Sequence, residues 1–93
     1  MVTVAVKVRL ELPAIGSLKE KRRIVKSLIA RLRNSFNISI AEVDEQDRLR
    51  SAVLGAAVVS NSTSFGHQVM AKVVSKIETS GEVILADYTL ETY

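Results

Sequence analysis

The 93-residue sequence contains no cysteine, a single histidine, a single proline and no tryptophan. Without cysteine the chain can form neither a disulfide nor a thiolate metal site, and thiol catalysis is excluded. No apolar run approaches the roughly 18 residues of a membrane-spanning helix. The N-terminus also lacks the basic, apolar and small-residue pattern of a signal peptide. These absences predict a cytoplasmic protein that does not enter a membrane.

The length of the chain and the distribution of its charge indicate one domain with a basic segment. Residues 1–93 fit one domain, because a chain of this length hides about 60 to 68% of its surface and builds one core. The net charge is only +3, but residues 17–34 hold seven Lys or Arg against one Glu. A basic segment in an otherwise mildly acidic chain indicates a directed contact with a partner.

Hydrophobic periodicity predicts six elements of secondary structure. Apolar and polar residues alternate from residue 2 to 12, as in a strand with one buried face. Ser17 followed by Glu20 is a capping-box pattern that opens a helix. Gly81 is placed to end the second helix in a left-handed conformation. The predicted order is a strand at 2–12, a helix at 17–34, strands at 38–43 and 52–60, a helix from about 61 to 80 and a strand at 83–90.

This order predicts the fold. Two right-handed βαβ crossovers joined in sequence give a ferredoxin-like βαββαβ sandwich of the α+β class. Its four-stranded antiparallel sheet carries both helices on one face. The strands at 2–12 and 52–60 are the most apolar, so we expect them in the centre of the sheet.

The strand at 52–60 is apolar on both faces, although helices can cover only one. We therefore expect a homodimer, formed through the open sheet face or through an exposed edge strand. Lys7, Arg9 and Glu11 would lie beside such a contact and could pair across a two-fold axis.

The helix at 17–34 is the main candidate for function. Cations in a first helical turn oppose the helix dipole by about 0.3 to 1 kcal/mol each, yet the same placement favours a docked anion. On a helical wheel most of the basic residues share one flank, while Lys21 lies near the apolar side. A solvated basic face and a protein partner are the alternatives. The residues expected to bind RNA or another polyanion are Lys19, Lys21, Arg22, Arg23, Lys26 and Arg33.

The kind of RNA is narrowed by the scarcity of aromatics. An RNA-recognition motif stacks bases on aromatic residues of its central strands, and here those strands have none. Structured RNA fits better, because its shape and phosphates can be bound without aromatic side chains.

A second cluster is acidic. Glu42, Asp44, Glu45 and Asp47 could bind a hard cation such as Mg²⁺ or supply an acid–base pair. The stretch lacks the glycine and terminal glutamate of a calcium-binding loop, so a solvated turn or an ion pair between subunits is favoured. His67, alone of its type, is expected to be a neutral surface residue. No catalytic motif, metal site or cofactor site is predicted, and we expect a non-enzyme.

The stretches "SLKEKR", "LIARLRNSFNISIAEVDEQD" and "LGAAVVSN" resemble the bacterial YlxP-like family of small domains of unknown function. The resemblance implies a ferredoxin-like fold and a gene neighbourhood that often includes translation initiation factor two and ribosome-binding factor A. The leading hypothesis is a non-enzymatic accessory protein of translation or ribosome assembly that binds rRNA. The alternative is a regulatory or scaffold homodimer that binds a protein or a small anionic ligand.

Overall fold

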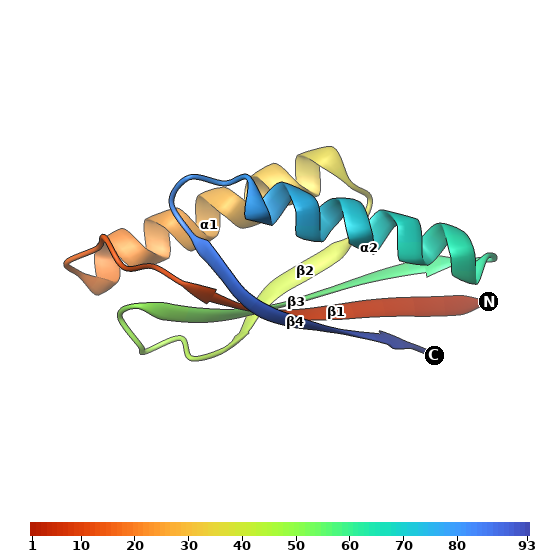
Figure 1. Ribbon diagram of the computed structural model, residues 1–93, viewed down its shortest axis with the longest axis horizontal. Coiled ribbons are helices and arrows are strands. Elements are labelled where there is room, and N and C mark those ends of the chain that lie inside the picture. The colour runs from red at the N-terminus through yellow and green to blue at the C-terminus, as the bar shows by residue number, and fades with distance from the viewer.

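The computed structural model describes all residues, 1–93, and its elements follow the predicted order (Figure 1). The strands form one antiparallel sheet in the order β2-β3-β1-β4, with both helices on one side of it. The ferredoxin-like fold and the two central strands are therefore confirmed. The elements are β1 (Val2–Glu11), α1 (Leu18–Ser35), β2 (Ser39–Asp44), β3 (Ser51–Ser60), α2 (Thr63–Glu78) and β4 (Ile84–Thr92).

Alternation along β1 divides its side chains between the two faces of the sheet. Val4 lies opposite Val58 and Val8 lies opposite Leu54, and all four are buried under the helices. The alternate residues Ala5, Lys7 and Arg9 point to the open face, and Lys7 is exposed there. A one-residue slip would expose this apolar set, so the hydrophobic pattern fixes the register.

Helix α1 begins at the predicted cap. The Ser17 Oγ accepts a hydrogen bond from the Glu20 N–H at 3.1 Å, and the Glu20 carboxylate accepts one from the Gly16 N–H at 3.4 Å. The helix ends where the Phe36 N–H donates to the Leu32 carbonyl. Both ends of this basic helix are thus determined locally by the sequence.

Helix α2 lies unusually close to the sheet at its first turn. A Cβ added to Gly66 would sit 2.7 Å from Val4 Cγ2, so glycine is required for this approach. At the other end the prediction of a left-handed Gly81 is wrong, because no glycine has positive φ. The helix instead ends at Thr79, which keeps right-handed backbone angles and donates to the Ser75 carbonyl.

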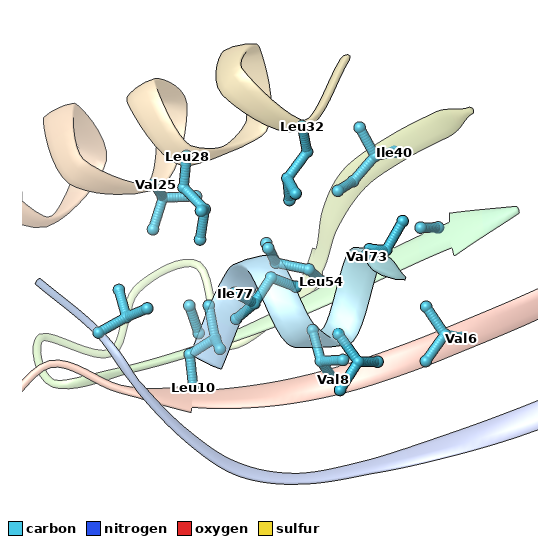
Figure 2. Close-up of a cluster of buried hydrophobic side chains, with 14 of the residues drawn as sticks. Val6, Val8, Leu10, Val25, Leu28, Leu32, Ile40, Leu54, Val73 and Ile77 are labelled. Atoms are coloured by element: carbon cyan, nitrogen blue, oxygen red, sulfur yellow. The ribbon is translucent and has the colours of Figure 1, made fainter. Parts of the chain in front are cut away.

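One hydrophobic cluster fills the space between helices and sheet (Figure 2). Leu28 and Leu32 of α1 point toward Leu54 of β3, and Val73 and Ile77 of α2 point toward the same layer. The helices therefore cannot shift over the sheet without opening this core. Neither helix has the length and hydrophobicity needed to cross a bilayer.

Candidate nucleic-acid interface

The outer flank of α1 carries a row of unpaired cations. Lys19, Arg22 and Lys26 are exposed, and none of the ion pairs in the structure includes them. Their spacing of three and four residues places them on one side of the helix. At 1.5 Å of rise per residue the row is about 10 Å long. A row of free, solvated positive charge of this kind can contact successive phosphates of a polyanion.

Two further arginines flank this row. Arg23 lies 3.7 Å from the Glu82 carboxylate, and both side chains are largely exposed. Such surface pairs contribute about 0 to 1 kcal/mol, so Arg23 is easily recruited by a stronger anion. Arg33, at the end of the helix, donates to the Ile40 carbonyl of β2 at 2.8 Å. Arg23 and Arg33 are therefore exposed like the row but already have partners within the chain.

The prediction that Lys21 binds RNA is wrong. Its side chain is completely buried, and its ammonium donates to the backbone carbonyls of Glu45 and Arg48 at 2.6 Å and of Gln46 at 3.3 Å. All three ammonium protons are therefore occupied, and no phosphate can reach them. The physical reason is its place on the wheel, since Lys21 lies within the apolar stripe and faces the loop between β2 and β3.

The residues of the acidic cluster also differ in their surroundings. The Glu42 carboxylate lies 3.3 Å from the Lys21 ammonium, so its ion pair is within the chain and not between subunits. Asp44 accepts from the Glu45 N–H at 2.8 Å, which supports the positive φ of 59° at Glu45. Asp47 is exposed. Nowhere in the chain do three acidic or histidine side chains converge as metal ligands do.

The remaining candidates form contacts within the chain. His67 is half-buried, and its Nε2 lies 2.8 Å from the Thr92 hydroxyl of β4. Arg9, one of three residues that could pair across a two-fold axis, pairs with Asp87 on the neighbouring strand at 3.2 Å. The open face carries a shallow hollow of about 380 Å³ over small residues, which are Ala5, Ala41, Gly55 and Ala57.

One apolar feature escaped the sequence analysis. Tyr88 and Leu90 of β4 lie opposite Val8 and Val6, on the side of the sheet that carries the helices. They are nevertheless 49% and 36% exposed, because the helices do not cover this edge strand. The sequence analysis assigned no face to these residues, and the extent of helix coverage is not visible in a periodic pattern.

Comparison with known proteins decides the family. The family described as "Protein of unknown function (DUF503)" matches residues 3–90. The chain belongs to this family. The uncharacterized protein YlxP of Bacillus subtilis (strain 168) is 37% identical over 68 residues, which cover 73% of this chain and 74% of that protein. The resemblance to YlxP-like proteins is thus confirmed.

Structural comparison supports the fold alone. The de novo designed protein Foldit4 aligns with a TM-score of 0.53 at 10% identity, covering 98% of this chain and 96% of the design. The designed protein Ferredog-Diesel aligns with a TM-score of 0.50 at 13% identity, covering 96% and 83%. At such low identity these matches describe only an architecture that this chain shares with the two designs.

Proposed function

We propose that this DUF503 protein is a non-enzymatic cytoplasmic accessory of translation or ribosome assembly that binds structured RNA through α1. The observation that carries the proposal is the exposed, unpaired row of Lys19, Arg22 and Lys26. Lys19 lies in the first turn of α1, where a cation costs helix stability when unbound, and that cost is offset when a phosphate docks there. The neighbourhood of translation genes that the resemblance implies favours RNA over other polyanions.

The mode of contact follows from the chemistry of the flank. Lysine and arginine heads on one helix side bind phosphates without selecting a base sequence. No aromatic side chain accompanies them on the helix, so base stacking contributes nothing there. Recognition would therefore depend on the spacing of phosphates in a folded RNA.

The test is binding to purified ribosomal subunits and to total RNA at two salt concentrations. The triple variant Lys19→Ala/Arg22→Ala/Lys26→Ala should fold normally and lose most of the affinity. Its plot of log affinity against log salt should be less steep by about 2 to 3, since each phosphate contact contributes about 0.7 to 0.9.

A matched control removes equal charge elsewhere. Arg50, Lys72 and Lys76 are exposed and lie outside the row, so Arg50→Ala/Lys72→Ala/Lys76→Ala should bind nearly as the wild type does. An equal loss of RNA affinity in both variants would show that binding depends on the overall charge and not on the row on α1. Unchanged affinity in the first variant would refute the proposed surface.

The second candidate function is a regulatory or scaffold homodimer that binds a protein or a small anionic ligand. The uncovered apolar strip of Tyr88 and Leu90 favours it. Binding with little salt dependence, or saturation by a small anion but not by RNA, would support this alternative over the first.

A further inference from the structure

The two edges of the sheet differ in how well they are protected. Strand β2 is six residues long, contains a bulge at Glu42/Asp44, and has its Ile40 carbonyl occupied by Arg33. Strand β4 is nine residues long and reads ILADYTLET, without the proline or lysine that usually blocks an edge. Its only irregularity opposes Arg9 and Leu10, so the stretch after Ala86 pairs regularly. Strand β4 is therefore the edge open to another strand.

The outward-facing backbone groups of β4 can be assigned. Thr3 and Tyr93 exchange both of their hydrogen bonds, at 3.1 and 2.8 Å. In an antiparallel ladder such pairs alternate with pairs whose N–H and C=O groups point away from each other. The regular register therefore directs the N–H and C=O groups of Tyr88, Leu90 and Thr92 away from β1. These groups form a free ladder along the edge.

The same residues carry the uncovered apolar strip. The side chains of Tyr88 and Leu90 project on the helix-bearing side of the sheet and remain substantially exposed. A strand added to this edge would satisfy the backbone ladder and cover the strip at once. An apolar strip and a free ladder on one edge are what a partner strand requires.

We infer that the partner is a second copy of this chain, with β4 paired antiparallel to β4 about a two-fold axis at Leu90. Each Leu90 then faces the partner's Leu90, and Tyr88 faces the partner's Thr92. The two sheets become one sheet of eight strands, with the helices of both copies on the same side. Tyr88 and Leu90 of both copies are buried between the two α2 helices.

The positions of the acidic residues on β4 favour an axis at Leu90 over the neighbouring registers. An axis at Thr89 would place Asp87 opposite the partner's Glu91, and an axis at Glu91 would place that carboxylate opposite its own copy. Like charges directly opposite destabilise an antiparallel pair. An axis at Leu90 instead places the partner's Glu91 opposite Thr89, which is itself paired with Lys7. An axis at Tyr88 would require pairing through the irregular stretch before Asp87.

The proposed dimer is independent of the RNA proposal. Helix α1 packs over the β2 side of the sheet, at the opposite edge from β4. Both basic flanks therefore stay exposed, at the two outer ends of the dimer. Failure of RNA binding would leave this inference intact, and the reverse also holds.

The absence of cysteine allows a clean cross-linking test. Facing Cα atoms across a two-fold pair lie within disulfide range, so Leu90→Cys should cross-link under mild diamide oxidation. Tyr88→Cys should not, because its own copy lies four residues away along the strand, or about 13 Å. Cross-linking of Tyr88→Cys but not of Leu90→Cys would overturn the register.

Sedimentation equilibrium tests the dimer itself. The wild type should dimerise at micromolar concentration, and a protein that is still monomeric at 100-fold higher concentration would overturn the inference.

Thr89→Glu should raise the dissociation constant of the dimer about tenfold or more, because the new carboxylate faces the partner's Glu91 while it can still pair with Lys7 in its own chain. Adding Glu91→Lys should restore dimerisation. A dimer broken by Ala57→Glu on the open face, but not by Thr89→Glu, would assign the contact to that face and refute the edge.

Discussion

The Lys21 ammonium lies 3.3 Å from the Glu42 carboxylate, and no part of the Lys21 side chain is exposed to solvent. The ammonium protons are directed to three loop carbonyls, so Glu42 contributes charge balance without a good hydrogen bond. This arrangement holds the loop between β2 and β3 against the first turns of α1. A residue that composition would count among the surface cations is thus part of the interior.

Replacing Lys21 with methionine should lower the free energy of unfolding by about 3 to 5 kcal/mol, because it leaves a carboxylate and three carbonyls without their cation. Urea unfolding followed by circular dichroism measures this. Lys19→Met, in the same helix but exposed, should change stability by no more than about 0.5 kcal/mol. Adding Glu42→Gln to Lys21→Met should restore part of the loss. Equal effects of Lys21→Met and Lys19→Met would contradict the structural role.

Gly66→Ala should destabilise the protein by about 1 to 3 kcal/mol, because its Cβ would overlap Val4 Cγ2. The sign is informative, since glycine to alanine inside a helix is otherwise stabilising by up to about 1 kcal/mol. Thermal unfolding of Gly66→Ala, Val4→Ala and the double variant should show that the loss in the double variant is smaller than the sum of the two single losses. Gly81→Ala, with no atom within 4 Å of its added Cβ, is the control and should be nearly neutral.

Ser17→Ala should cost about 1 kcal/mol, because the Glu20 N–H loses its acceptor at the start of α1. Ser27→Ala in the middle of the same helix is a matched control, since the Ser27 hydroxyl is exposed and caps nothing. It should be neutral or slightly stabilising. Chemical denaturation of both variants decides the point, and a Ser17→Ala variant as stable as Ser27→Ala would show that the cap is dispensable.

The Tyr93 hydroxyl donates to the Glu91 carboxylate, and this hydrogen bond and the nearby negative charge raise the pKa of Tyr93 above its usual 10.0. Because the folded-state pKa is raised, the associated stabilisation is present below pH 10 and is lost as pH rises through the raised value. Absorbance titration at 295 nm in a Tyr88→Phe background isolates this phenol. Glu91→Gln should move its midpoint back toward 10.0, and an unmoved midpoint would exclude the carboxylate as the cause.

Much of the fold was predictable from the sequence because its determinants are local. Alternation in β1 and the Ser17–Glu20 cap depend on neighbouring residues only. The position of Lys21 near the apolar side of the helical wheel indicated that it could be buried. Its carbonyl partners, however, come from a loop 24 to 27 residues away in the sequence. A local sequence pattern does not predict where the loop between β2 and β3 lies relative to α1. The uncovered strip on β4 depends likewise on where α2 rests on the sheet, which packing of the whole core decides.

The attachment of Lys21 also bears on proteolysis. Residues 46–48 are exposed and include Arg48, a site where trypsin would be expected to cut. A protease must draw several residues into an extended conformation, and the carbonyls of Gln46 and Arg48 are held by a buried ammonium. Cleavage there requires pulling that charge away from its partners first. This exposed loop is therefore protected against nicking by a side chain that no protease can reach.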